Sequence, residues 1–382
     1  MNVKKQNPPL IMISAGEASG DLHGAHLIQS VLIKNSDITF KGMGGNSMAN
    51  AGCELIVDCK KLAIIDLIEI FTRAKDIWRA MKIMRQSLKT LRPNLLVLID
   101  FSGFNLRLAR FAHKLGIKIL YYVSPQVWAW RVHRVEKIKR YVNQMAVIYP
   151  FEVDFYQKRQ VPALYVGNPV AHKIKMDLNP LELKKSLGLN LDKKTIGLVP
   201  GSRRGEINRN LPTILKAAEL LLKTHPELQF VLPLASSLQE ADLKEHLAQS
   251  NLPITITRNR VDETIPACDA VIAVSGTVTL EIGLLTIPMV IIYKLTPISF
   301  QIGKRVIKVD HIGICNLIAG KRVVQELIQF QATPEAIHDE IHKILSNDAY
   351  RNQMVEELNQ MKHKLLSVPT QNNIAQLVLN LI

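Results

Sequence analysis

The residues of this sequence best suited to chemistry follow the ends of predicted strands. Residues 270–274 form an apolar run that predicts a buried strand, and Ser275, Gly276 and Thr277 follow it directly. A helical pattern then begins, with Glu281 in its first two turns. Free N–H groups at a helix start bind anions, and a carboxylate beside them can accept hydrogen bonds from sugar hydroxyls. The stretch predicts an anion site, with an ordinary capped turn as the alternative, because Ser and Thr are favoured helix caps.

A second strand end in the same half of the chain carries positive charge. Residues 195–200 have a strand pattern that ends in Gly201, Ser202 and Arg203. The planar guanidinium group of arginine binds phosphate through paired hydrogen bonds. Together the two strand ends suit a nucleoside diphosphate, with Glu281 placed for the hydroxyls of its ribose.

An acidic residue ends a third predicted strand, in the N-terminal half of the chain. The apolar residues 95–99 precede Asp100, and open α/β sheets bind ligands beyond the carboxyl ends of their strands. Asp100 is therefore either a cap for the following helix or a general base close to bound substrate. The next strand, residues 117–123, leads into a loop with Trp128 and Trp130, which we expect at the ligand end of the sheet.

Two arrays of alternating strands and helices must position these residues. A polar, charged stretch after Val170 separates the arrays, as expected of an interdomain linker. A chain of 382 residues also exceeds one ordinary core. We therefore predict an α/β protein with two doubly wound Rossmann-like domains facing across a cleft. The predicted domains are residues 1–170 and 171–340. The helices of residues 341–382 either cross back to the N-terminal domain or pair with another subunit.

A basic, amphipathic stretch lies between residues 60 and 92. Its apolar residues recur at helical spacing and include Leu67, Ile68, Phe71, Trp78 and Met81. The pattern is typical of a helix that packs on a core, and on its own it favours that interpretation. The alternative is a helix in a membrane interface, where aromatic side chains and basic flanks suit anionic lipid.

The charge balance predicts an anionic partner. The net charge is +15 and the pI is near 9.6, which suits nucleic acid, an anionic membrane surface or a phosphorylated substrate. The sequence has no RNP, KH or zinc motif, so we expect no nucleic acid. It also has no Walker A motif, no GxSxG and no cluster with metal-ligand spacing, which argues against P-loop chemistry, acyl hydrolysis and a metal site. No apolar run reaches the ~18 residues of a membrane span.

Several motifs, in order along the chain, resemble those of the lipid-A-disaccharide synthases. They are SAGEASGD (residues 14–21), YVSPQVWAWR (122–131), PGSR (200–203), SGT (275–277) with Glu281, and NLIAG (316–320). The resemblance implies an inverting glycosyltransferase of the GT-B fold that uses no metal and no cofactor. It would join UDP-2,3-diacylglucosamine to 2,3-diacylglucosamine 1-phosphate (lipid X) by a β-1,6 linkage and release UDP.

The same resemblance implies a location and partners. The enzyme would be cytoplasmic and peripheral on the inner face of the inner membrane of a Gram-negative bacterium, with the anionic membrane surface as a partner. A homodimer is a further hypothesis. Another GT-B enzyme that uses UDP-N-acetylglucosamine, an epimerase or a lipid II-type transferase, is the alternative function, although the SPQVWAWR stretch argues against it.

Carried over residue by residue, the resemblance makes Asp100 the base that takes a proton from the acceptor 6-hydroxyl. The donor nucleotide would contact Ser202, Arg203, Ser275, Gly276, Thr277, Glu281 and Asn316, and the acceptor side would include Gly16, Glu17, Ser19, Asn105 and Ser124. The region of Leu67, Ile68, Phe71, Trp78 and Met81 would meet membrane and acyl chains. Family members often carry Met-Gly where this chain has Ile65 and Asp66, and an acid where it has Gly103.

Overall fold

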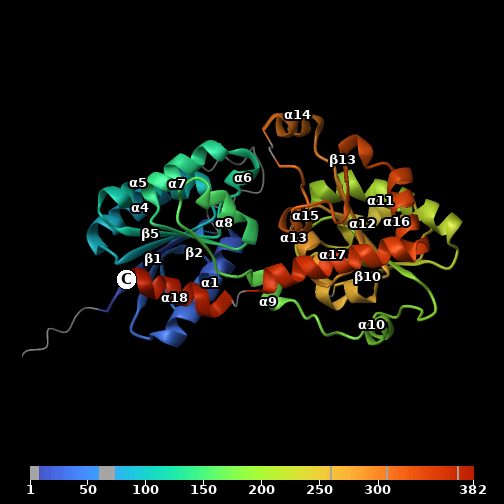
Figure 1. Ribbon diagram of the computed structural model, residues 1–382, viewed down its shortest axis with the longest axis horizontal. Coiled ribbons are helices and arrows are strands. Elements are labelled where there is room, and N and C mark those ends of the chain that lie inside the picture. The colour runs from blue at the N-terminus through green and yellow to red at the C-terminus, as the bar shows by residue number, and fades with distance from the viewer. Residues whose placement is uncertain (1–7, 60–73, 259, 307–308, 368–369) are drawn as a thin grey trace, which may run out of the picture. The chain divides into compact units, whose positions relative to one another are not determined.

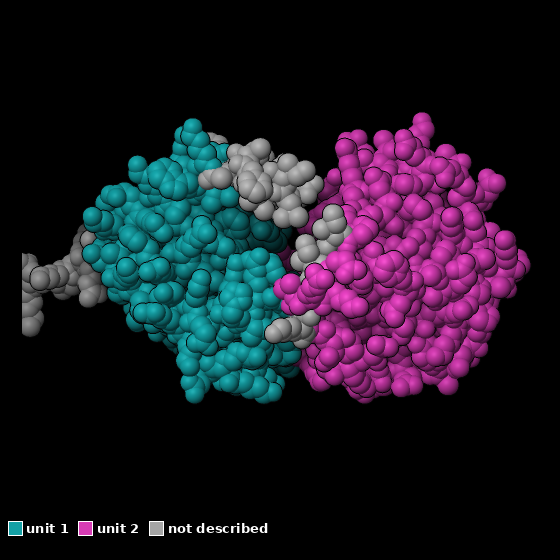
Figure 2. Space-filling view, turned by 90° about the horizontal axis from the view of Figure 1, so that it is seen from above, with its two compact units in different colours: residues 1–169, 367–382 teal, residues 170–366 magenta. Residues whose placement is uncertain are grey.

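The chain divides into two compact units, coloured separately in Figure 2. Unit 1 contains residues 1–169 and 367–382, and unit 2 contains residues 170–366. A computed structural model describes residues 8–59, 74–258, 260–306, 309–367 and 370–382. The second domain was predicted to end at residue 340, with C-terminal helices after it. In the structure, residues 341–366 belong to unit 2 and residues 367–382 belong to unit 1.

Unit 1 is built on a seven-stranded parallel sheet. The strand order is β3-β2-β1-β4-β5-β6-β7. The strands are β1 (Leu10–Ala15), β2 (Thr39–Gly44), β3 (Cys53–Asp58), β4 (Leu95–Ile99), β5 (Lys118–Tyr122), β6 (Gln144–Val147) and β7 (Ala163–Tyr165). The order reverses between β1 and β4, and a reversal of this kind opens a crevice at the carboxyl ends of the two strands.

Helices cover both faces of this sheet (Figure 1). They are α1 (Ala18–Lys34), α2 (Asn46–Asn50), α4 (Ala74–Leu91), α5 (Ser102–Lys114), α6 (Val127–Trp130), α7 (Val135–Tyr141), α8 (Pro150–Gln157) and α18 (Thr370–Leu381). Strand residues alternate between the two faces: Met12 packs in the core with α4, α5 and α7, while Ile11 and Ile13 pack with α1 and α18. The strands are therefore apolar on both sides, as parallel strands require.

The last helix of the chain completes the core of unit 1. Ile374, Ala375 and Val378 of α18 are fully buried and pack with α1. The sequence separates the two helices by more than 300 residues, yet they lie side by side below the sheet in Figure 1. The C-terminus thus contributes apolar surface to the N-terminal unit.

Unit 2 repeats the architecture with a six-stranded parallel sheet of order β10-β9-β8-β11-β12-β13. Its strands are β8 (Thr195–Val199), β9 (Gln229–Pro233), β10 (Ile254–Thr257), β11 (Ala270–Val274), β12 (Met289–Tyr293) and β13 (Gln325–Ile328). The order reverses between β8 and β11. The two sheets confirm the predicted α/β class with two doubly wound Rossmann-like halves.

The helices of unit 2 pack on its sheet and on one another. They are α10 (Pro180–Ser186), α11 (Arg204–Thr224), α12 (Ala241–Leu247), α13 (Thr277–Leu284), α14 (Pro297–Val306), α15 (Ile314–Ala319), α16 (Pro334–Ser346) and α17 (Asp348–Leu366), while α9 (Pro169–Lys173) lies at the boundary. α16 packs against α11 and the sheet, and α17 packs against α13 and α15. In the part of the chain that the structure describes, no helix is both long and apolar enough to cross a membrane.

Candidate active site

The reversal of strand order in unit 1 brings Asp100 and Glu17 to the same edge of the sheet. β1 and β4 pair in register with Ala15 opposite Ile99, so the residues after each strand emerge side by side. Burial, and secondly the charge of Glu17, raise the pKa of Asp100 to about 6, although the backbone N–H of Phe101 opposes the shift. A carboxylate with a raised pKa at the ligand end of a sheet is suited to general-base chemistry.

The backbone around Asp100 is strained. Asp100 and Phe101 both have φ of 43°, in the left-handed region that costs a non-glycine residue ~1–3 kcal/mol. Position 16 also requires glycine, because a Cβ atom on Gly16 would overlap the ring of Phe101. The β1–α1 turn and the Asp100–Phe101 turn therefore approach each other too closely for a side chain at position 16.

Buried hydrogen bonds hold this strained turn in place. The side-chain amide of Asn105 donates to the carbonyl oxygens of Asp100 at 2.9 Å, Ile99 at 3.0 Å and Ser14 at 3.2 Å, and its oxygen accepts from the Ser14 hydroxyl at 2.7 Å. The Tyr121 hydroxyl donates to the Asp100 carbonyl at 2.6 Å. Asn105 is fully buried. It was expected on the acceptor side, but its side chain positions Asp100 instead.

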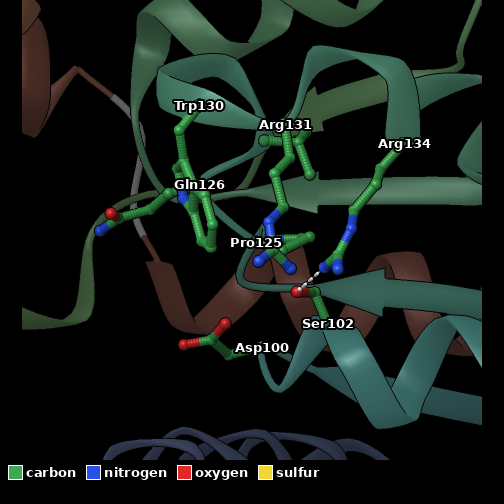
Figure 3. A pocket seen from close by; sticks show the side chains of 8 residues that line it. Asp100, Ser102, Pro125, Gln126, Trp130, Arg131 and Arg134 are labelled. Carbon is green, nitrogen blue, oxygen red and sulfur yellow. Dashed lines mark hydrogen bonds between the residues drawn. The ribbon is translucent and has the colours of Figure 1, made fainter. Parts of the chain in front are cut away.

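Asp100 lines a pocket of about 240 Å³ within unit 1 (Figure 3). The lining residues are Asp100, Ser102, Pro125, Gln126, Val127, Trp130, Arg131 and Arg134. Arg134 donates to the Ser102 hydroxyl at 2.7 Å, and the Arg131 guanidinium lies 3.8 Å from the ring centroid of Trp130. The sequence placed the loop after β5 at the ligand end of the sheet, but the two arginines were missed.

A buried polar network supports this loop from behind. The Ser124 hydroxyl lies 2.6 Å from that of Tyr156, and the indole N–H of Trp128 donates to Glu152 at 3.0 Å. Burial raises the pKa of Glu152 to about 7. Ser124 was expected on the acceptor side, yet it is buried and bonded inside the protein. Glu17 and Ser19, by contrast, are exposed at the start of α1.

The reversal of strand order in unit 2 joins the predicted donor residues. β8 and β11 pair with Val199 opposite Ala273, so the turn through Ser202 and Arg203 and the turn through Ser275, Gly276 and Thr277 leave the same edge. Gly276 precedes the first residue of α13, and a Cβ atom there would meet nothing within 4 Å. Of the amides at this turn, those of Ser275 and Thr279 already donate to the carbonyls of Ile292 and Gly276. The first amides of a helix have no acceptor within it, so those of Thr277 and Val278 suit an anion.

A carboxylate that was not part of the predicted donor site, that of Glu206, lies beside Ser202 and Arg203. Glu206 accepts the Ser202 backbone N–H at 2.9 Å and lies 3.9 Å from the guanidinium of Arg203. The amide of Ser202 is therefore engaged, while its side chain and that of Arg203 are exposed. Burial, then the charge of Asp262, raise the pKa of Glu281 to about 7.

Asn316 was predicted to contact the donor nucleotide, and in the structure its side chain is bonded within the protein. It is fully buried. Its oxygen accepts from the backbone of Val323 at 2.8 Å and Val324 at 3.0 Å, and its nitrogen donates to Glu326 at 2.7 Å and to the Val324 carbonyl at 2.9 Å. All four hydrogen bonds of an amide side chain are thereby used. The Asn316 side chain thereby closes the turn after α15, and its predicted contact with the nucleotide stays a prediction.

The predicted membrane residues divide into three groups. Leu67, Ile68 and Phe71 lie outside the described residues. Trp78 of α4 is 66% exposed, whereas Met81 is 9% exposed and belongs to the core. Met81, Met84 and Leu88 recur at helical spacing on the side of α4 that packs in the core of unit 1. The membrane contact expected of Met81 stays a prediction. Among the described residues no group of three His, Cys, Asp or Glu side chains could hold a metal ion.

Comparisons with solved structures relate this architecture to GT-B proteins. The chain is similar to a putative UDP-N-acetylglucosamine 2-epimerase from Listeria monocytogenes (TM-score 0.63, 10% identity, covering 98% of this chain and 95% of that one). It is equally similar to a calicheamicin glycosyltransferase (TM-score 0.63, 12% identity, 98% of each chain). Identities this low show the shared fold alone, and the fold is GT-B.

Sequence comparisons are more specific. The family model described as lipid-A-disaccharide synthetase matches residues 11–379. The lipid-A-disaccharide synthase of Trichlorobacter lovleyi is 48% identical over 375 residues, covering 98% of each chain. That of Geobacter sulfurreducens is 47% identical over 372 residues, covering 97% of each. The chain therefore belongs to the lipid-A-disaccharide synthetase family and is a glycosyltransferase that forms the lipid A disaccharide.

Proposed function

We propose that the chain transfers 2,3-diacylglucosamine from UDP to the 6-hydroxyl of 2,3-diacylglucosamine 1-phosphate. The observation that carries this proposal is the Asp100 site: a carboxylate with a raised pKa, at a strand end, in a pocket wide enough for a sugar headgroup. Relatives that cover nearly the whole chain at 42–48% identity carry the name of this activity. They argue against an epimerase or a lipid II-type transferase.

Asp100 is the general base of the reaction. It accepts the proton of the acceptor hydroxyl as that oxygen attacks the anomeric carbon of the donor from the face opposite UDP. The new glycosidic bond forms while the bond to the β-phosphate oxygen breaks, so the anomeric configuration inverts. With a pKa of about 6, Asp100 is ionised at neutral pH and more basic than an ordinary aspartate. Such a base contributes ~10²–10⁴-fold to the rate.

The turns at the ends of β8 and β11 receive the nucleotide. The exposed guanidinium of Arg203 and the first-turn amides of α13 stabilise the negative charge that grows on UDP as it leaves. Glu281 lies in the second turn of the same helix, where its carboxyl accepts hydrogen bonds from the ribose hydroxyls. The chemistry needs neither a metal nor a cofactor, because these fixed charges and dipoles face the leaving group.

We propose that the enzyme acts at the inner face of the inner membrane, because both of its proposed substrates carry acyl chains that a lipid surface would hold. The net charge of +15 attracts an anionic lipid surface. The exposed indole of Trp78, with the ammonium group of Lys82 5.7 Å from its ring centroid, is an amphipathic pair of the kind that favours a membrane interface. This part of α4 is therefore the described surface that we expect closest to lipid.

Incubation of the protein with both acylated substrates tests the proposal. We expect equal amounts of disaccharide and UDP, in the presence of a metal chelator as well as in its absence. Replacement of the donor by UDP-N-acetylglucosamine alone tests the alternative, because an epimerase would convert that substrate without an acceptor. Absence of disaccharide with both substrates present would overturn the proposed function.

A further inference from the structure

The pocket beside Asp100 contains positive charge that the proposed reaction does not use. Arg131 and Arg134 both line it, and they extend from the segment after the β5 loop towards Ser102 and Pro125 (Figure 3). Among the ion pairs of the described residues, neither arginine has a carboxylate partner. The hydrogen bond of Arg134 goes to a neutral hydroxyl, that of Ser102.

The arginines repel each other and lie in a partly desolvated place. Burial, together with the charges of Arg131 and Arg107, lowers the pKa of Arg134. Arg131 stacks on Trp130 and Arg134 bonds to Ser102, but neither contact neutralises a charge. An anion placed between the two guanidinium groups would offset their repulsion.

The start of α5 adds backbone donors to the same pocket. Ser102 is the first residue of this 13-residue helix, and the N–H groups of Phe104 and Asn105 already bond to the Phe101 carbonyl. The two amides before them have no acceptor within the helix. A Cβ atom on Gly103 would meet nothing within 4 Å, so this end of the helix is open to a ligand. A helix N-terminus and two arginine forks together match a phosphate group.

We infer that Arg131, Arg134 and the N-terminus of α5 bind the 1-phosphate of the acceptor sugar. The inference rests on the proposed function, because it takes Asp100 to receive the proton of the acceptor 6-hydroxyl. The hydroxyl and the phosphate are substituents of one hexose ring, so the phosphate must lie within a ring's breadth of the base. The basic wall of the pocket is the part of it that can meet an anion there.

A phosphate site of this kind would let the enzyme distinguish its two substrates, which carry the same acylated sugar. In the donor, C1 of the sugar is linked through a diphosphate to uridine. In the acceptor, C1 carries a terminal phosphate monoester with ~1.5–2 negative charges near pH 7. A pocket of about 240 Å³ is smaller than the ~300–1,000 Å³ of drug-sized sites. Its volume suits the phosphate and part of the sugar ring, and its arginines favour a terminal phosphate monoester, which carries more charge than each phosphate of a diphosphate diester. The arginines thus select the acceptor and orient its 6-hydroxyl towards Asp100.

The test compares two acceptors in the wild type and in an Arg134→Gln variant. One acceptor is 2,3-diacylglucosamine 1-phosphate and the other is its methyl glycoside, which lacks the phosphate. We expect the wild type to prefer the phosphorylated acceptor, and Arg134→Gln to lower kcat/KM for it ~10–100-fold, the range for a charge-assisted hydrogen bond. The value for the methyl glycoside should change less than about twofold. Arg131→Gln should act in the same way, and Arg140→Gln, an exposed arginine on α7, should change neither value.

Further measurements separate the possible failures. The inhibition constant of UDP should be the same in all variants, and a large rise in Arg134→Gln would assign the arginines to the donor diphosphate instead. Equal losses on both acceptors, or a wild type without preference, would overturn the inference while the transferase function stands. If the wild type forms no product with the phosphorylated acceptor and none with the methyl glycoside, the proposed function itself is refuted. If Arg134→Gln does not fold, Arg134→Lys keeps the charge without the fork and should show a smaller loss confined to the phosphorylated acceptor.

Discussion

Replacement of Asp100 by asparagine should make the protein more stable while it removes most of the activity. The folded state raises the pKa of Asp100 from 3.8 to about 6, chiefly by burial. The protonated carboxyl is therefore the form that folding favours. At neutral pH the residue is ionised in a place that disfavours its charge, so asparagine removes an unfavourable charge of the native state.

The size and the pH range follow from the two pKa values. A group whose pKa is higher in the folded protein contributes stability that is fully present below its unfolded pKa and is lost as the pH rises through its folded pKa. Here the loss runs from pH ~4 to just above pH 6. A shift of about two units corresponds to ~3 kcal/mol at most. Asp100→Asn cannot titrate, so its free energy of unfolding relative to wild type should rise by up to ~3 kcal/mol between pH 4 and pH 8.

Urea unfolding at pH 4.5 and pH 8, on both proteins, measures this difference directly. The same preparations should bind UDP equally well, while turnover of the variant falls at least ~100-fold. A variant that is equally or less stable than wild type at pH 8 would show that Asp100 is not a strained, desolvated charge. Retained turnover would separately exclude it as the base.

Three further changes probe the surroundings of the base and the lipid-facing surface. Glu17→Gln removes the charge that adds to the effect of burial on the pKa of Asp100, so the acid limb of the kcat/KM profile should move to lower pH by roughly 0.5–1 unit. If the acid limb of the pH profile does not move, a group other than Asp100 is responsible for it. Asn105→Ala should lower kcat ~10–100-fold without a change in the dissociation constant of UDP, because a misplaced base costs rate and not donor affinity; a loss of UDP binding instead would indicate general unfolding. Trp78→Ser should weaken binding to anionic vesicles in a flotation assay, whereas Ile33→Ser, at an even more exposed apolar position on α1, should not. Equal effects of the two would remove the special role of α4.

The sequence was sufficient to predict which residues follow the strands at the two reversals of strand order, because apolar runs mark the strand ends in parallel sheets. Apolar runs locate the strands. Asp100 and Ser275 each follow one directly, and Ser202 follows β8 after Pro200 and Gly201. Both positions where the strand order reverses carry predicted residues. The order itself was not needed, since the residue types after each strand already marked the ligand end.

Residue identity was less informative about which side chains are free to bind. Asn105 and Asn316 have the polarity of ligand contacts, yet both are fully buried and bonded to the protein. An amide can satisfy a backbone turn as well as it can satisfy a ligand, and only the positions of its partners distinguish the two uses. Arg131 and Arg134 were missed for a related reason. A basic run is usually a solvated helix face, and the short 3-10 turn of Val132–Arg134 brings these two to the pocket.

The strained turn at Asp100 is in contact with the SAGE motif (residues 14–17), although Gly16 and Asp100 are 84 positions apart in the chain. Asp100 and Phe101 keep left-handed dihedral angles only because Asn105 and Tyr121 hold the Asp100 carbonyl and Ser14 holds Asn105. The turn also needs the space that Gly16 leaves for the ring of Phe101. Ser14 and Gly16 thus support the backbone conformation from which the Asp100 side chain extends. Gly16 was expected on the acceptor side, and here its lack of a side chain is also a requirement for the turn that positions Asp100.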